Sequence, residues 1–195
     1  LIKNNDFIEL EFTGYANESV FDSNIPEDLK KISKDAKPQK TIVIVGQKMV
    51  VQGLDKELVG KEIGKEYKVD VNYKEGFGER KRELVKTIPL KIFTNQKINP
   101  RPGATLLLDN SLAKIITISG ARVITDFNNP LAGKNLKYKF KAKKKISEKK
   151  EKVETFFKHF LKFSPEFEET SEKVVVKGPK VLQNLVESFK EKFKE

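Results

Sequence analysis

The sequence predicts an α+β fold, because two kinds of apolar periodicity occupy different parts of the chain. Alternation of apolar and polar residues, which is typical of strands, opens the chain in "DFIELEFTGY" and returns in "KEYKVDVNY" and "LKYKFKAKK". Apolar residues at helical spacing dominate only after about residue 146. Sheets are therefore expected in the first part of the chain, followed by a C-terminal extension that contains helices.

The first segment, about residues 1–83, reads as strands joined by turns and one short helix. Residues 7–12 alternate, so that 8, 10 and 12 share one face of a strand, which Gly14 is expected to end. "TIVIVG" predicts a buried strand closed by a glycine turn. A helix is expected from Leu54 to Leu58, ending near Gly60.

The second segment, about residues 84–130, is interrupted by prolines and holds three strand-like runs, TLLLD, AKIITIS and RVITDF. The sequence Ser119-Gly120-Ala121 between the last two runs predicts a hairpin. The alternation of apolar and polar residues seen in the first segment resumes directly afterwards, at about residue 131. This segment is therefore expected to form a small domain inserted into a larger one.

The third segment, residues 146–195, is predicted to contain helices at Glu148–Phe163 and Lys180–Phe193, with a strand at "KVVVK" between them. Each helix carries an apolar stripe, and about fifty residues bury little apolar surface by themselves. The stripes can pack on the same chain, or a second copy can cover them symmetrically. We predict the second arrangement, a homodimer joined through residues 146–195.

Composition excludes several kinds of chemistry. The chain has 195 residues, no Cys and a single His, so cysteine catalysis, disulfides and a histidine-rich metal site are not expected. The apolar runs are of strand length, which predicts no membrane span, and the first residues lack a secretory pattern, which predicts a cytoplasmic protein. The net charge is +11, with nine Lys between Lys134 and Lys150, but no nucleic-acid motif accompanies them. Specific nucleic-acid binding is therefore not expected.

The stretch "VFDSN", residues 20–24, allows two interpretations. Asp-Ser-Asn is ordinary turn chemistry, and a Phe at a strand end commonly belongs to the core. Alternatively, Phe21 and Asp22 form one wall of a functional site. The local pattern alone favours the first interpretation.

Four spaced stretches of the sequence favour the second interpretation, in which Phe21 and Asp22 belong to a functional site. "FTGYANESVFDSN", "GQKMVVQGLDKELVGKEIGKEYKV", "EGFGERKRELVKTIP" and "NNPLAGKNLKYKFKAKK" resemble, in this order, the FKBP-type peptidyl-prolyl isomerases, especially the SlyD-like branch. The resemblance covers about residues 1–145, and long-type archaeal members of the family carry a C-terminal extension. It implies an antiparallel half-barrel sheet wrapped on a short helix over 1–83 and 131–145, with an insert-in-flap chaperone domain at 84–130.

The resemblance also implies the site. An apolar cleft is expected between sheet and helix, and the positions that match it are Phe12, Phe21, Asp22, Val50, Val51, Leu54, Phe77 and Tyr138. Phe12 and Phe77 stand where the family commonly has a Tyr, so two hydroxyl groups are missing. No cofactor or metal is implied, and the metal-binding tail of bacterial SlyD is absent from this sequence. A macrolide is a candidate ligand of the cleft.

The expected partners are unfolded, proline-containing polypeptides. Candidates for a client-binding groove in the insert are Leu84, Val85, Ile88, Pro89, Ile92, Phe93 and Phe127, although some of these side chains can equally fill a small core. Two alternatives stay open at this point. One is a holdase chaperone with a vestigial isomerase cleft, and the other is a basic ribosome- or RNA-associated folding factor that uses the lysines of 134–150.

Overall fold

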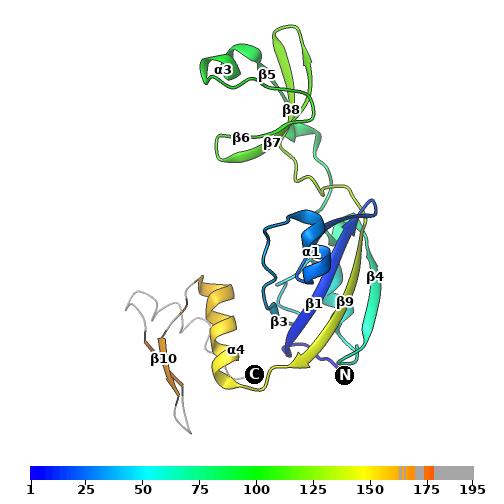
Figure 1. Cartoon of the computed structure of the whole chain (residues 1–195), viewed down its shortest axis with the longest axis vertical. Coiled ribbons are helices and arrows are strands. Elements are labelled where there is room, and N and C mark those ends of the chain that lie inside the picture. The colour runs from blue at the N-terminus through cyan, green and yellow to red at the C-terminus, as the bar shows by residue number, and fades with distance from the viewer. Residues whose placement is uncertain (163, 165, 170–173, 178–195) are drawn as a thin grey trace. The chain divides into compact units, whose positions relative to one another are not determined.

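The computed structural model describes residues 1–162, 164, 166–169 and 174–177. Contacts divide the chain into two compact units (Figure 1). The first unit contains Leu1–Val71 and the chain from Leu136 onward, and the second contains Asn72–Asn135. The second unit is thus wider than the insert predicted at 84–130, because the flanking segments are hydrogen-bonded to each other. The Gly133 N–H donates to the Gly78 carbonyl between the two flanks, and Arg80 of the first flank pairs with Asp126 inside the predicted insert.

The first unit is built on an antiparallel sheet. Its strands are β1 (Phe7–Ala16), β2 (Ser19–Ser23), β3 (Ile42–Ile44), β4 (Glu66–Val71) and β9 (Leu136–Lys145). They lie in the order β2-β1-β9-β4, and β3 pairs with the other part of β1. The predicted alternation is confirmed, since Ile8, Leu10 and Phe12 are buried on one face of β1. The prediction that Gly14 ends this strand is wrong: β1 continues to Ala16, because the neighbouring strands β2 and β9 both pair with it beyond Gly14.

Two short helices complete the FKBP-like part of the first unit. Helix α2 (Gln52–Leu58) confirms the predicted helix and begins two residues earlier. It lies close to β4, since a methyl group at Gly53 would be 2.5 Å from a Val71 methyl, and this approach buries Leu54 and Leu58 completely. Helix α1 (Pro26–Ile32) was not predicted; it has no buried residue and therefore no clear apolar stripe.

The second unit contains a separate four-stranded antiparallel sheet in the order β5-β8-β7-β6. Its elements are η1 (Tyr73–Glu75), η2 (Arg82–Leu84), β5 (Val85–Pro89), α3 (Leu90–Asn95), β6 (Thr105–Leu108), β7 (Ser111–Ser119) and β8 (Arg122–Asp126). The hairpin predicted at 119–121 is confirmed. Phe93 from α3 packs with Ile115 and Val123 of the sheet to form a small core. The α+β class is thus confirmed in both units.

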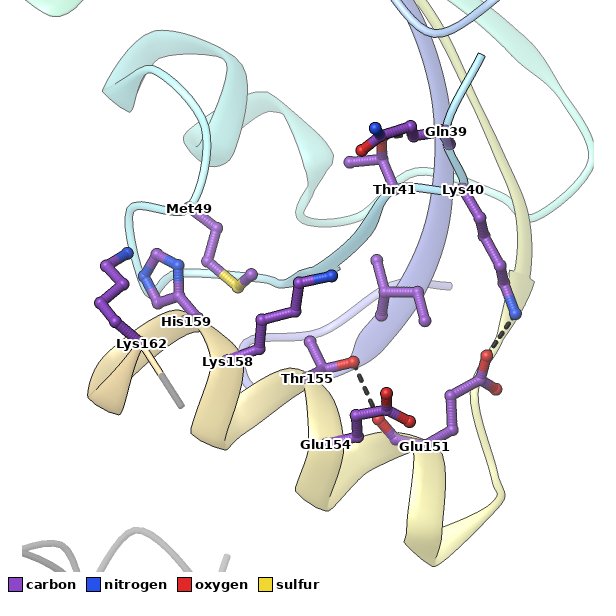
Figure 2. Close-up of a pocket in the computed structure, with 11 residues that line it drawn as sticks. Gln39, Lys40, Thr41, Met49, Glu151, Glu154, Thr155, Lys158, His159 and Lys162 are labelled. Atoms are coloured by element: carbon purple, nitrogen blue, oxygen red, sulfur yellow. Dashed lines mark hydrogen bonds and ion pairs between the residues drawn. The ribbon is translucent and has the colours of Figure 1, made fainter. Parts of the chain in front are cut away.

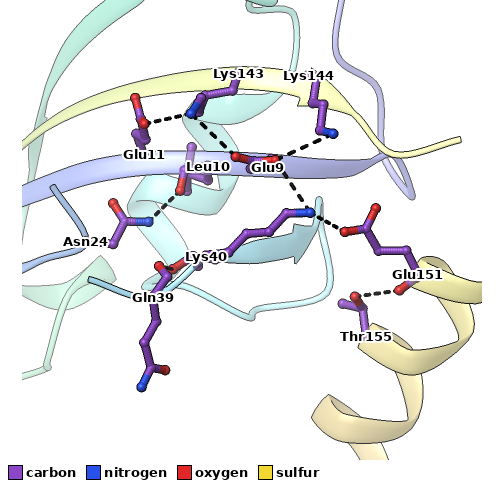
Figure 3. A network of polar contacts seen from close by, with 11 residues as sticks. Glu9, Leu10, Glu11, Asn24, Gln39, Lys40, Lys143, Lys144, Glu151 and Thr155 are labelled. Carbon is purple, nitrogen blue, oxygen red and sulfur yellow. Dashed lines mark hydrogen bonds and ion pairs between the residues drawn. The ribbon is translucent and has the colours of Figure 1, made fainter. Parts of the chain in front are cut away.

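The C-terminal helix packs on its own chain. Helix α4 (Lys149–Phe156) continues as a π-helical turn, η3 (Phe157–Leu161). Phe156 and Phe157 are buried against Ile44, and Phe7 and Met49 pack against the same cluster. An ion pair between Lys40 and Glu151 adds a polar contact between helix and sheet (Figure 3). The first apolar stripe is therefore covered without a second copy, contrary to the reasoning that led to the predicted dimer.

The rest of the extension is described only in part. Strand β11 (Val174–Lys177) confirms the strand predicted at "KVVVK", and it pairs with β10 (Glu166–Glu169), which was not predicted. The second predicted helix, Lys180–Phe193, lies outside the described residues. None of the helices in the described part of the chain has the length and apolar character needed to cross a bilayer.

Candidate functional site

A β-bulge directs Phe21 over the sheet of the first unit. Gly14 is paired with Asp22 and Tyr15 with Val20, so Phe21 is the extra residue of β2 between these two pairs. A bulge increases local twist and turns a side chain away from the regular pattern. The Phe21 ring occupies the space above Gly14, where a methyl group would lie 2.7 Å from Cζ of Phe21 and 2.9 Å from Cε1 of Tyr138. The absence of a side chain at Gly14 is thus what admits both rings.

Three of the predicted site residues form an aromatic cluster. The rings of Phe21 and Tyr138 meet edge to face with centroids 5.8 Å apart, and those of Phe12 and Tyr138 are 6.3 Å apart and tilted. Phe12 and Tyr138 are buried, whereas Phe21 is half-buried. Edge-to-face pairs at this separation are favourable because the positive ring edge meets the negative ring face. The cluster presents Phe21 as its accessible member.

The residues after Phe21 and Asp22 anchor them to β1. The Ser23 hydroxyl donates to the Phe12 carbonyl at 3.0 Å and lies 3.0 Å from the Thr13 hydroxyl. The Asn24 side chain accepts from the Phe12 N–H at 2.8 Å and donates to the Leu10 carbonyl at 2.7 Å. These side-chain bonds continue the ladder past the end of β2. Ser23 and Asn24, which the sequence suggested only as turn residues, therefore fix the position of the wall.

Asp22 and Tyr138 form the polar part of this region. Burial raises the pKa of the Asp22 carboxyl, with a hydrogen bond from the Ser23 backbone acting in the opposite direction, although the residue as a whole is exposed. Burial also raises the pKa of the Tyr138 phenol, and the negative charge of Asp22 adds to this shift. Tyr138 consequently stays protonated at neutral pH and keeps its hydroxyl as a hydrogen-bond donor.

The remaining predicted cleft residues differ in accessibility. Leu54 lies on α2 and is completely buried, so it supports the wall without being exposed to solvent. Val50 and Val51 are half-buried in the loop that precedes α2. Phe77 is half-buried in the second unit, and its part in the cleft stays a prediction. A separate hollow of about 580 Å³ includes Tyr138 in its lining but is bordered mostly by charged side chains such as Lys68, Asp70 and Lys137.

The second unit has an apolar hollow of about 300 Å³ beside α3. Five predicted client-binding residues line it, namely Ile88, Pro89, Ile92, Phe93 and Phe127. Phe93 also belongs to the core of this unit, whereas Ile92 is 48% exposed. Leu84 and Val85 are half-buried but do not line the hollow.

The sequence analysis missed one apolar pair in this unit. Leu107 and Leu112 face each other across the β6–β7 hairpin and are 65% and 61% exposed. Period-two alternation within "TLLLD" places Leu107 on the opposite face from Leu106 and Leu108, which pack against the core, and could have revealed it.

The basic run 134–150 is partly neutralised by carboxylates. Lys139 pairs with Glu66 at 3.0 Å, Lys143 with Glu11 at 3.1 Å, and Lys145 with Asp6 at 2.6 Å. Alternating lysines on β9 thus face acidic side chains of the neighbouring strands β1 and β4 and, for Lys145, of the residue before β1. Within the described residues, no group of three His, Asp or Glu side chains is arranged to hold a metal ion.

Comparison with known proteins shows the family of the chain. Residues 86–131 match the protein family described as "FKBP26, IF domain". The chain is 31% identical over 147 residues to a short-type peptidyl-prolyl cis-trans isomerase of Methanocaldococcus jannaschii, covering 73% of this chain and 93% of that protein. It is 33% identical over 98 residues to the FKBP-type isomerase SlyD of Haemophilus influenzae, covering 48% of this chain and 50% of that protein. The SlyD of Helicobacter pylori is 26% identical over 143 residues, with 72% and 71% covered.

These likenesses define the class of protein first: the chain belongs to the peptidyl-prolyl cis-trans isomerases. Within that class it is of the FKBP type, in the SlyD-like branch that carries an insert-in-flap domain. The resemblance recognised in the sequence is thereby confirmed. The assignment to long-type archaeal members stays a prediction.

Proposed function

We propose that this chain isomerises X-Pro bonds in unfolded polypeptides at the wall formed by Phe12, Phe21, Asp22 and Tyr138. The observation that carries the proposal is the bulge at Phe21, which sets an aromatic edge against Tyr138 above Gly14. This is an apolar surface with one polar rim, as a prolyl ring and its imide bond require. Val50 and Val51 are proposed to line the same cleft, and the buried Leu54 to support it. The part of Phe77 stays a prediction from the family resemblance.

The reaction requires no nucleophile. A prolyl bond isomerises by twisting out of conjugation against a barrier of roughly 20 kcal/mol, and no covalent bond is broken. The planar imide is more dipolar than the twisted state, so an apolar cleft disfavours the ground state relative to the transition state. Phe21 contributes to that environment, while the protonated Tyr138 hydroxyl can donate to a substrate carbonyl in place of the hydroxyls missing at Phe12 and Phe77.

Proline-limited refolding of an unfolded protein tests this site. Phe21→Ala and Asp22→Ala should each reduce kcat/KM about tenfold, equivalent to ~1.4 kcal/mol of transition-state stabilisation, while circular dichroism shows an intact fold. Val20→Ala on the same strand and Asp35→Ala, an exposed acid, are the matched controls. Wild-type rates in both site variants would remove the assignment. Suppression of aggregation by a chain without isomerase activity would instead favour the holdase alternative.

The insert is proposed to hold the client near the cleft. Its hollow beside Ile88, Ile92 and Phe127 is apolar and open to solvent, which suits an extended apolar peptide. A second weak site raises the effective concentration of a tethered proline segment at the first. The exposed Leu107–Leu112 pair adds apolar surface to the same unit.

Three finer predictions are kept as proposals. A macrolide is proposed to bind the cleft weakly, because Phe12 provides no hydroxyl for it.

A homodimer now depends on the apolar stripe predicted at 180–193, since the stripe of α4 packs within the chain. Sedimentation of the full chain at high micromolar concentration should show a dimer, and a monomer there would refute it. We also propose a cytoplasmic location, which a cysteine-free chain suits.

A further inference from the structure

The loop 46–51 connects the end of β3 with the start of α2 and contains two of the proposed cleft residues, Val50 and Val51. Its backbone takes the left-handed conformation twice, at Gly46 with φ +83° and at Lys48 with φ +57°. Residues other than glycine rarely adopt this conformation, because it is unfavourable for a residue with a side chain. Contacts outside the loop must therefore hold it in this shape.

Asp55 of α2 holds the first half of the loop. Its carboxylate is buried and accepts hydrogen bonds from the Gly46 and Lys48 N–H groups, both at 2.9 Å. Two backbone donors on one carboxylate fix the turn at 46–48. These bonds end before Val50 and Val51.

Met49 holds the second half of the loop 46–51 through its contact with an apolar cluster. Its sulfur accepts from the Ile44 N–H at 3.1 Å, and its side chain packs on the cluster of Ile44, Phe156 and Phe157. In Figure 2, Met49 extends from the loop toward the C-terminal helix, near Lys158 and His159. Phe160 packs on the same cluster from η3. The residue directly before Val50 is thus in contact with the C-terminal extension.

The C-terminal helix is itself fixed to the sheet at its other end. Lys40 pairs with Glu151 of α4 and lies 3.7 Å from Glu9 of β1 (Figure 3). Lys143 and Lys144 also approach Glu9, at 3.6 and 3.9 Å. A bulge makes this convergence possible, because Glu9 pairs with Lys144 and Leu10 with Ala142, which leaves Lys143 as the extra residue of β9. The helix is therefore anchored at one end by charge and at the other by apolar packing.

We propose that the C-terminal helix positions the loop 46–51 through Met49, and that Met49 is a positioning residue for substrate binding at Val50 and Val51. The proposal rests on the function proposed above, because it needs these two residues to line the cleft. The loop is fixed by hydrogen bonds at 46–48 and at its end, where the Val51 carbonyl accepts from the Asp55 N–H at 3.0 Å, and Met49 holds the residues between these two points. Without the contact of Met49, residues 49 and 50 sample arrangements that do not bind substrate. Binding then selects the competent fraction, so KM rises while kcat stays the same.

Steady-state isomerisation of a proline tetrapeptide by the full-length chain tests this. Met49→Ala and Phe160→Ala should each raise KM about tenfold at nearly constant kcat, as a competent fraction of roughly one tenth requires. Met49→Leu keeps the side-chain volume and should restore most of the affinity. Lys150→Ala, an exposed position on α4 away from Met49, should leave both constants unchanged. Hydrogen exchange of the peptide that covers 46–51 should rise in the first two variants.

The two constants separate positioning from general damage. A merely structural role would lower the amount of folded enzyme, so apparent kcat would fall at an unchanged KM, and that result overturns the proposal. Wild-type KM and exchange rates in both Met49→Ala and Phe160→Ala overturn it as well. If the unaltered chain does not isomerise the tetrapeptide, the proposed function fails; increased exchange at 46–51 would still establish the contact with the helix.

Discussion

The chain adds two elements to the sheet of the first unit, and they are stabilised in different ways. The insert has its own core around Phe93, Ile115 and Val123. The C-terminal helix has none, because its Phe156 and Phe157 share a core with Ile44 of β3. A core mutation in an element that has its own core need not destabilise the adjoining unit. A core mutation in an element that shares its core with that unit destabilises both. The helix is therefore part of the unit that carries the proposed cleft, and the insert is a separate module.

A matched pair of core substitutions should give the largest effect. Phe157 and Phe93 are 2% and 1% exposed, so each change to Ala removes a fully buried ring, at a cost of about 3–5 kcal/mol. Phe157→Ala should raise hydrogen exchange throughout β1 and β9, while Phe93→Ala should raise it only within the second unit, Asn72–Asn135. Mass spectrometry of protease fragments measures both. Unchanged protection of β1 and β9 in Phe157→Ala would contradict a shared core.

Replacement of residues 84–130 by a short loop should have the next largest effect. Activity on a tetrapeptide should stay near that of the complete chain, because the wall at Phe21 and Tyr138 belongs to the other unit. Activity on an unfolded protein should fall roughly tenfold or more, since the second site no longer raises the effective concentration of the client. The two substrates are compared at equal enzyme concentration. Equal losses on both would argue against a separate client-binding module.

The pH dependence of Asp22 should give the smallest effect. Burial raises its pKa, so the folded state holds this proton more tightly than the unfolded state. The resulting stabilisation is present at acidic pH below the ordinary pKa and is lost as pH rises through the raised one. Asp22→Asn should remove this dependence, and the variant should gain relative stability as pH rises, within about 0.5 kcal/mol. Urea unfolding on both sides of this window measures the difference, and parallel pH profiles would speak against burial of the carboxyl.

Much of the fold follows from local pattern. The strands at β1, β4, β7, β8 and β9 were predicted because alternation of period two needs no knowledge of distant residues. Helix α2 was predicted at Leu54–Leu58, ending near Gly60, within two residues of its observed start. Helix α1 and helix α3 have few residues, and only Phe93 of α3 is buried, so neither produces a strong helical stripe.

The candidate site was predicted less completely. Phe21 and Asp22 were identified through a family resemblance, since "VFDSN" alone favours an ordinary turn. The closeness of Phe21 to Tyr138 depends on pairing between segments more than one hundred residues apart in sequence. Gly14, Ser23 and Asn24 were not recognised as supports of the wall, because glycine, serine and asparagine also mark ordinary turns.

By itself, the sequence determined the α+β class, the strand periodicity, the absence of cysteine chemistry and the likeness to FKBP-type isomerases. Only the tertiary structure decided the register of β1 and β2, which makes Phe21 the bulged residue, and the surface that covers the stripe of α4. An apolar stripe predicts that a helix face will be buried, but it does not predict which surface will cover that face. The reason is that the free energy gained by burying apolar surface is roughly proportional to the buried area and is not directional. Here Ile44, Phe7 and Met49 cover it, and through Met49 the C-terminal helix contacts the loop that contains Val50 and Val51.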